Sequence, residues 1–482
     1  MRLEDVFVAA VLVVLLIAAG KSIRNHVRVL RRLYLPSSLI GGVLALLVGP
    51  QTLGWVIQRL ADDDAPLASG IWPERVLDVW SAAPALLISV VFAGLFLGKQ
   101  IPKPRQIWKR AGPMVMHGQT LAWGQYVVGI TLTIVLLSPV WGVSPLAGAL
   151  IEIGFEGGHG TAAGLSGSFA DLGFADGADL ALGMATVGVV MGVFIGTMLI
   201  NWGVARGHIP KPDADDPDDE DESNQRSDHD AREKTRVPSR LRDRAVDSLS
   251  IHLGLFGAAI SIGWLLLEAM TRLEAALLVP LGWPELMKHI PLFPLAMIGG
   301  VVVQVSAARA GWSRRIDRKL INRVSGASLD VLIVAAMATL SLGALGEHIW
   351  VFVLLCAAGI AWNVFGLLVL APRMFPENWM QNGMANFGQG MGMTVVGLLL
   401  VRMSDPDNKT NAMDAFGYKQ LLFEPVVGGG LFTAASLPLI AEFGPVPVLI
   451  GVGVLMAGWL TAGLLTASRA SRRSDADDDS SD

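Results

Sequence analysis

The sequence predicts an all-α polytopic membrane protein: two inverted-topology repeats of five transmembrane helices, each with a re-entrant loop, plus one extra C-terminal helix. Three observations predict this fold. Of the 482 residues, 52% are hydrophobic and only 16% are charged, which is typical of membrane proteins. Eleven apolar runs are long enough, or nearly so, to cross a bilayer. Two glycine-rich segments, 145–168 and 379–402, interrupt this pattern at matching places in the two halves.

The apolar runs define the expected transmembrane helices in chain order. The first repeat, 1–206, contains runs at 6–20, 36–50, 82–98, 114–137 and 179–204. The second repeat, 247–441, contains runs at 248–270, 290–308, 327–346, 348–371 and 421–441. A last run at 445–466 has no counterpart in the first repeat. Glu4 and Asp5 precede the first run, where a signal peptide would carry positive residues, so we expect this run to be retained.

The distribution of basic residues orients the chain. With the N-terminus outside and the C-terminus in the cytoplasm, the inner segments hold 32 of the 37 Lys and Arg residues, as the positive-inside rule requires. Counting either glycine-rich segment as a full crossing would place several basic loops outside. Each segment must therefore leave and return on one side, the first outside and the second inside. We expect a multi-pass protein of the cell (inner) membrane.

Two charged segments lie outside the predicted helices. The linker 207–246 has an acidic block followed by basic residues, and its low hydrophobicity predicts a disordered cytoplasmic segment. The tail 467–482 is acidic and predicted to be cytoplasmic. The formal net charge of -5 reflects these blocks and does not suggest a nucleic-acid partner. The one cysteine, Cys356, lies in an apolar run, so no internal disulfide can form.

The first glycine-rich segment carries candidate substrate-binding residues. Its motif GGHGT consists of Gly157, Gly158, His159, Gly160 and Thr161. Glycine frees backbone groups from helical pairing, and a bilayer tolerates such groups only where protein buries them or water reaches them. Two half-helices meeting here would present N–H groups and a positive dipole end to an anion, and carbonyl groups to a small cation such as Na⁺.

Two carboxylates lie beside this motif, Glu156 at the expected junction and Glu152 one turn earlier. An ionisable group at membrane depth is costly and is functional by default, so both are predicted to form a Na⁺ or proton site. The structural alternative is that both lie near the outer surface. For His159 we weigh packing through its ring nitrogens against proton transfer, since a lone histidine lacks partners for a metal site.

The second glycine-rich segment offers neutral groups. Asn386, Gly388, Gln389 and Thr394 are predicted to face the first segment and to bind an α-amino or carboxylate group. Paired glycine-broken segments at corresponding positions of two halves are the best sequence indication of a transporter's binding site.

Other polar and small residues have structural interpretations. Glu424 is expected to reach the inner interface from the end of its helix. Thr186, Thr433 and Ser436 are expected to bond their own helix backbones. The small residues of 183–196 are expected to pack against the first re-entrant segment.

The glycine-rich motifs also resemble those of a known family. GGHGT, followed by ATVGVVMGVFIG from Ala185, closely resembles the first signature of the glutamate:sodium symporter family. NGMANFGQGMGMT, 382–394, resembles its second signature more loosely. The resemblance covers about residues 1–440. It implies a secondary transporter that acts as a homodimer and moves acidic amino acids with Na⁺ by an elevator-like shift of a transport core.

Some positions depart from that pattern. Glu156 stands where the family usually has a small hydroxyl residue, and Met384 where a histidine is common. Of a threonine-proline-threonine run only Thr394 remains. Thr433 and Ser436 stand where an aspartate and an asparagine are expected. A carboxylate at Glu156 would repel glutamate unless it is protonated or holds a cation.

The sequence therefore predicts sodium-coupled symport of glutamate or a related small carboxylate, with Na⁺ as the coupling ion. One alternative is a proton-coupled carrier or exchanger of another organic acid or amino acid, in which Glu156 titrates. The other is a non-transporting sensory or channel-like membrane protein. A membrane enzyme is least expected, because His159 has no paired metal motif. The predicted partners are the small carboxylate or amino-acid substrate, membrane lipid and a second copy of the chain.

Overall fold

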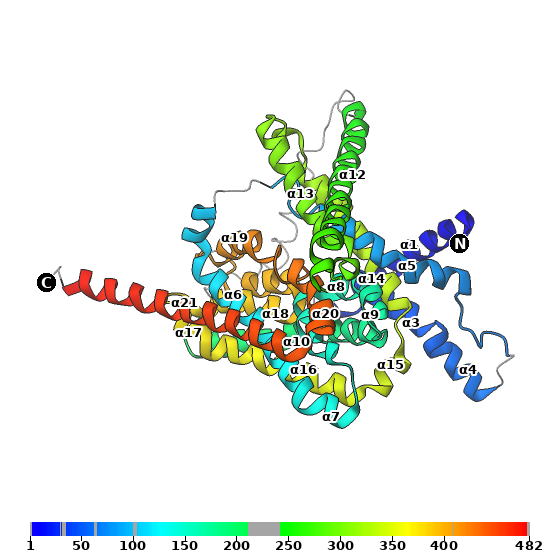
Figure 1. The fold of residues 1–482 in the computed structure, drawn as a ribbon, viewed down its shortest axis with the longest axis horizontal. Helices are drawn as coiled ribbons and strands as arrows, with labels where there is room; N and C mark the ends of the chain where they lie inside the picture. The colour runs from blue at the N-terminus through cyan, green and yellow to red at the C-terminus, as the bar shows by residue number, and fades with distance from the viewer. Residues whose placement is uncertain are drawn as a thin grey trace.

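The computed structural model describes residues 2–28, 30, 35–61, 65–99, 104–210, 242–407 and 409–479. Within these ranges the regular elements are helices, and no strand occurs. The helices form one bundle with the two termini at opposite sides of the view, and the final helix α21 (Pro445–Asp479) extends away from it (Figure 1). Most of the predicted linker, 207–246, lies outside the described residues.

The helices of the first half follow the apolar runs. They are α1 (Leu3–His26), α3 (Ser37–Leu47), α4 (Trp55–Leu60), α5 (Glu74–Ala93), α6 (Pro104–Leu132), α7 (Ser138–Trp141) and α10 (Asp176–Ala205). Short π-helical turns continue α3 into α4 and α6 into α7, so that each pair forms one apolar span.

The helices of the second half also follow the apolar runs, except at 421–441. It contains α12 (Arg242–Leu273), α13 (Leu292–Arg309), α14 (Arg318–Ala338), α15 (Leu342–Glu347), α16 (Ile349–Phe365), α17 (Ala371–Met374), α18 (Trp379–Ser404), α19 (Ala412–Phe423) and α20 (Leu431–Phe443). Eleven helices of the described chain are long and apolar enough to cross a membrane, and ten coincide with predicted runs. The chain is therefore a multi-span membrane protein.

The predicted span 421–441 is wrong as a single helix. Helix α19 ends at Phe423 and α20 begins at Leu431, with a turn between them. In this turn Gly428 and Gly429 have φ angles of 72° and 96°, which lie in the left-handed region where a helix cannot continue. A hydropathy average does not register three consecutive glycines among apolar residues. The eleventh apolar helix is instead α18, which contains the second glycine-rich segment.

The helices pack in two groups around the glycine-rich segments. Helix α14 packs against α3 and α5, and α5 also contacts α13, which packs on α12. On the other side α6 contacts α16, α19 and α21. Helix α10 contacts both glycine-rich segments, so it positions the candidate site.

Candidate functional site

The first glycine-rich segment is built from short, irregular helices. It comprises η3 (Pro145–Ala149), η4 (Glu152–Gly157), α8 (Gly158–Gly164) and α9 (Ser166–Asp171). Gly158 has a φ of 72° and a ψ of -168°, so the helical path is broken at this residue. A residue with a Cβ would be strained there, which explains the glycine.

Contacts of the neighbouring helices show where this segment begins and ends. Helices α6 and α16 run antiparallel, because His117 Nε2 lies 3.1 Å from Gly366 O while Trp362 Nε1 donates to Leu121 O at 2.9 Å. The end of α6 is therefore near the start of α16. The start of α10 lies there too, since Asp176 Oδ2 is 3.4 Å from His348 Nε2. The segment thus leaves and returns at the same end of the bundle, as a hairpin.

The second segment, α18, is also a hairpin. Gly392 and Met393 have non-helical angles, with a φ of 62° at Met393. A Cβ added to Gly388 would lie only 2.7 Å from Gly397 Cα. Nine residues of continuous helix would span about 13 Å, so the chain must double back between these glycines. Its length and hydropathy match a crossing, but its path reverses midway.

Helix α10 shows that the second hairpin enters from the opposite end. Near the middle of α10, a Cβ on Gly188 would overlap Met391 O beside the hairpin's tip. At the end of α10, a Cβ on Gly203 would lie 3.1 Å from Met380 Cε at the hairpin's base. That base is therefore at the end of the bundle away from Asp176.

The small residues of α10 pack against both hairpins. The first hairpin contacts α10 through Met184, whose Cβ would lie 2.7 Å from a Cβ on Gly154, and through Phe155, whose ring would lie 2.9 Å from a Cβ on Gly188. Gly188 also approaches Met391 O, while Gly192 and Gly196 face only α18. The expectation that this block packs on the first segment therefore holds for Gly188 and is wrong for Gly192 and Gly196.

The tips of the two hairpins touch. A Cβ on Gly158 would overlap Met393 Sδ, so the break of the first hairpin lies against the break of the second. The glycine turn between α19 and α20 completes the junction. A Cβ on Gly428 would lie 3.7 Å from Glu156 Cγ and 3.8 Å from Gln389 Nε2, between the two hairpins.

Glu152 is fully buried and saturated with hydrogen bonds. Its Oε2 accepts from Tyr126 Oη at 2.6 Å, and its Oε1 accepts from Gly428 N at 2.7 Å and from Thr433 Oγ1 at 2.9 Å. One carboxylate thus joins α6, the first hairpin and the glycine turn. Thr433 was expected to bond its own helix, but its hydroxyl donates to Glu152. Ser436 does bond its own helix, at Thr433 O.

Lys419 is a candidate site residue that the sequence analysis missed. It is 0% exposed, and its Nζ donates to Asn386 Oδ1 and to Gln389 Oε1, each at 2.9 Å. Nζ also lies 3.7 Å from the ring centroid of Phe423. The positive-inside count placed Lys419 in an inner loop. Its position within the apolar run AFGYKQLLF was the signal for burial.

A polar chain continues from Lys419 towards the end of α19. Gln420 Nε2 donates to Gln389 Oε1 at 2.8 Å and to Thr394 Oγ1 at 3.1 Å, and Thr394 donates to Glu424 Oε1 at 3.0 Å. Glu424 is 9% exposed, so the expectation that it reaches the interface is wrong. At the bundle's edge, burial lowers the pKa of Lys99 and the carboxylate of Glu424 opposes this shift.

Three buried acceptor atoms of α19, its C-terminal end and the first hairpin have no hydrogen-bond partner within the described chain: Glu156 Oε2, Glu424 Oε2 and Gln420 Oε1. His159 Nδ1 also has no partner there, and His159 Nε2 lies 3.0 Å from Thr186 Oγ1. Unpaired buried acceptors are costly, and together they favour a cation or a hydrogen-bond donor as ligand.

Of the predicted substrate-binding residues, Gly157 and Thr394 are half-buried and the others are buried. Not all of them line the junction. Gly160 faces Ile88 of α5, and Gly388 faces Gly397 of its own hairpin, so both allow close packing. Thr161 Oγ1 donates to Gly157 O within the first hairpin.

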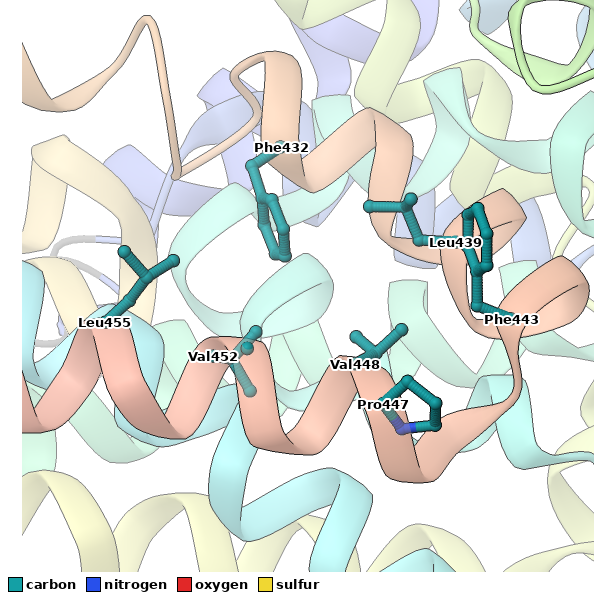
Figure 2. A pocket seen from close by; sticks show the side chains of 8 residues that line it. Phe432, Leu439, Phe443, Pro447, Val448, Val452 and Leu455 are labelled. Atoms are coloured by element: carbon teal, nitrogen blue, oxygen red, sulfur yellow. The ribbon is translucent and has the colours of Figure 1, made fainter. Parts of the chain in front are cut away.

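A cavity of about 270 Å³ lies elsewhere, between α20 and α21 (Figure 2). Its lining is apolar throughout: Phe432, Leu439, Phe443, Pro447, Val448, Gly451, Val452 and Leu455. It is separate from the polar cluster at the hairpin tips and offers no group to a charged solute.

The comparisons with known proteins agree with this architecture. The family model described as the sodium/glutamate symporter matches residues 85–397, which include the first hairpin and most of the second. No curated protein matches the chain. The match covers more than half of the 482 residues and confirms the resemblance of the two motifs. The chain therefore belongs to the sodium/glutamate symporter family, which is a family of transporters rather than of enzymes.

Proposed function

We propose that this protein is a secondary transporter that couples the movement of glutamate, or a related small carboxylate, to a Na⁺ gradient. The observation that carries the proposal is the meeting of two hairpin tips, Gly158 and Met393, that enter from opposite ends of the bundle. A solute held between such tips becomes accessible from one side of the membrane or the other when one tip or the surrounding helices move. Broken helices at the centre of a bundle are the usual binding elements of secondary transporters.

Glu156 is proposed as the residue that couples cation to substrate. It is 3% exposed, and its Oε2 lacks a partner in the described part of the chain, beside the glycine turn. A Na⁺ ion bound there would neutralise the carboxylate, and a carboxylate substrate could then approach without repulsion. The ion thereby favours the loaded site over the half-loaded one, which is what coupling requires.

Glu152 suits a different role from the one predicted. Its two oxygens already accept three hydrogen bonds, so it holds the glycine turn against the first hairpin and leaves Glu156 as the ion ligand. The substrate carboxylate is proposed to meet the N–H groups of 157–161. Gln389 and Thr394 would contribute from the second hairpin together with Asn386, whose Oδ1 accepts a hydrogen bond from Lys419.

The proposed arrangement in the membrane follows from the same elements. The repeats 1–206 and 247–441 would be related by inverted topology, with the N-terminus outside and the C-terminus in the cytoplasm. The positive-inside distribution supports this orientation. As the family resemblance implies, we propose a homodimer in which the hairpins and α10 move as a transport core.

The purified protein in proteoliposomes tests the function. Uptake of labelled glutamate, aspartate and dicarboxylates is measured under Na⁺ and H⁺ gradients imposed separately. Saturable uptake that requires inward Na⁺ is the expected result. Uptake driven by the H⁺ gradient alone would favour the proton-coupled alternative, for which the buried Glu156 and Lys419 are available. Non-saturating passage without ion dependence would indicate a channel and contradict the proposal.

The Glu156→Gln variant tests the coupling role in the same vesicles. We expect its Na⁺ dependence to be lost and glutamate uptake to fall about tenfold or more, within the usual range of coupling energies. Unchanged dependence on Na⁺ would remove Glu156 from the mechanism. Protein-free liposomes give the background.

A further inference from the structure

Lys419 is held as a bound cation would be held. The ammonium group is fully buried, and its oxygen ligands are the side-chain carbonyls of Asn386 and Gln389, each at 2.9 Å. The ring of Phe423 covers it at 3.7 Å, an attractive cation–π distance. Within the described chain no carboxylate forms an ion pair with it. Neutral oxygens and a ring face surround the charge.

Asn386 is oriented independently of the lysine. Asn386 Nδ2 donates to Met114 O at 3.1 Å and lies 3.0 Å from His117 Nδ1, which directs Oδ1 towards Lys419. His117 is oriented in turn, because its Nε2 lies 3.1 Å from Gly366 O. These contacts fix the amide so that its oxygen points into the site whatever cation occupies it.

Helix α6 packs closely against the ammonium group of Lys419. A Cβ on Gly118 of α6 would lie 2.6 Å from Lys419 Nζ. Glu156 and Glu424 act on the ammonium electrostatically, but Lys419 bonds to neither of them directly. Carbonyl oxygens at fixed positions also coordinate small hard cations such as Na⁺ in transporters.

We propose that the Lys419 ammonium is a resident cation that occupies a Na⁺-type position on the second hairpin. It supplies the positive charge there permanently, so that this position needs no transported ion. Removing the ammonium group should open a new Na⁺ site between Asn386 and Gln389. The inference deepens the proposed function, on which it rests, by stating which part of the cation requirement is built into the chain.

Lys419→Met is the decisive variant. Methionine retains the apolar stem that packs on Phe416 and Phe423, but it ends one atom earlier and lacks the charge. Binding of radioactive Na⁺ and thermal stability in NaCl against choline chloride are measured on the purified full-length protein. We expect the variant to bind one more Na⁺ per protomer than the wild type and to gain a larger stabilisation by NaCl. Lys409→Met, which removes an exposed lysine, is the matched control and should behave as the wild type.

The proposal is overturned if Lys419→Met binds no additional Na⁺ and shows the wild-type response to NaCl. It is also overturned if glutamate affinity is lost equally at all Na⁺ concentrations, because the lysine would then bind the substrate itself. Lys419→Ala repeats the test with a larger vacancy. If neither variant folds in either salt, Na⁺ binding to purified Asn386→Ala without substrate decides. A dissociation constant for Na⁺ within about twofold of the wild type supports the resident cation, and a tenfold rise places Na⁺ at this oxygen and refutes it.

Failure of this proposal can be told apart from failure of the proposed function. If wild-type uptake does not depend on Na⁺, the transport proposal fails. Na⁺ binding to purified Lys419→Met can still succeed, because that measurement involves no transport.

Discussion

Substitution by glutamine should lower the stability of the protein at Glu152 but not at Glu156. Both carboxylates are buried, and they lie four residues apart in the first hairpin. Glu152 accepts hydrogen bonds from Tyr126, Gly428 and Thr433, whereas Glu156 Oε2 accepts none from the described residues. Replacing each by glutamine keeps the shape of the side chain and removes its charge.

The hydrogen bonds of Glu152 determine how much the free energy of unfolding falls in Glu152→Gln. A hydrogen bond to a charged group contributes roughly 1.5–3 kcal/mol and a neutral one roughly 0.5–1.5 kcal/mol, so a bond loses about 1 kcal/mol or more when its acceptor oxygen becomes neutral or is replaced by the NH₂ group of glutamine, which cannot accept. Three bonds make Glu152→Gln less stable by about 3 kcal/mol, or roughly a hundredfold in the unfolding equilibrium. Glu156→Gln loses no such bond and also relieves its repulsion with Glu152, so its stability should equal or exceed that of the wild type.

Thermal unfolding of the purified variants in detergent, without Na⁺, measures the difference. We expect a clear fall in the melting temperature for Glu152→Gln and none for Glu156→Gln. Uptake separates the roles further, because Glu152→Gln should keep its Na⁺ dependence at permissive temperature and Glu156→Gln should not. Equal melting temperatures, or the reverse order, would refute the assignment of Glu152 to structure and Glu156 to coupling.

Two further predictions concern the hairpins. Gly188→Ala should separate α10 from Met391 and reduce uptake at least tenfold, whereas Gly254→Ala, which meets nothing within 4 Å, should be neutral or stabilise α12 by up to about 1 kcal/mol. Comparable uptake by the two alanine variants in proteoliposomes would contradict the close approach of α10. In a cysteine-free background, cysteines at the exposed Gly167 of the first hairpin and Arg402 of the second should react with an impermeant reagent from outside and from inside, respectively. Labelling of both from one side in intact cells would exclude opposite entry of the hairpins.

Much of the fold was predictable, because the bilayer restricts which backbone structures a membrane-spanning segment can form. Backbone groups in hydrocarbon must be paired, so long apolar runs become helices, and ten of the predicted runs coincide with apolar helices of the structure. The same restriction made the glycine breaks at 157–161 and 388–394 conspicuous. Such breaks are tolerated at membrane depth only where protein buries the freed backbone groups or water reaches them.

The sequence alone did not reveal the third break or the buried lysine. The turn at Gly428 disappeared in a hydropathy average, and Lys419 was counted as a loop residue because the helix was expected to begin after it. Both errors have one cause. The hairpins bury the glycine turn and Lys419, whereas the local sequence pattern placed the turn in a transmembrane helix and the lysine in an aqueous loop. Lys419 is tolerated in the interior because Asn386 and Gln389 bring oxygens to it.

Local sequence determined the helices, the two hairpin motifs and the family of this protein. Only the tertiary structure decided which polar groups meet, such as Glu152 with Thr433, 281 residues apart. Whether a segment forms a helix in the bilayer depends on the apolar character of neighbouring residues, and this can be read directly from the sequence. A buried charge depends instead on donors and acceptors from distant segments, and these come together only when the whole bundle packs.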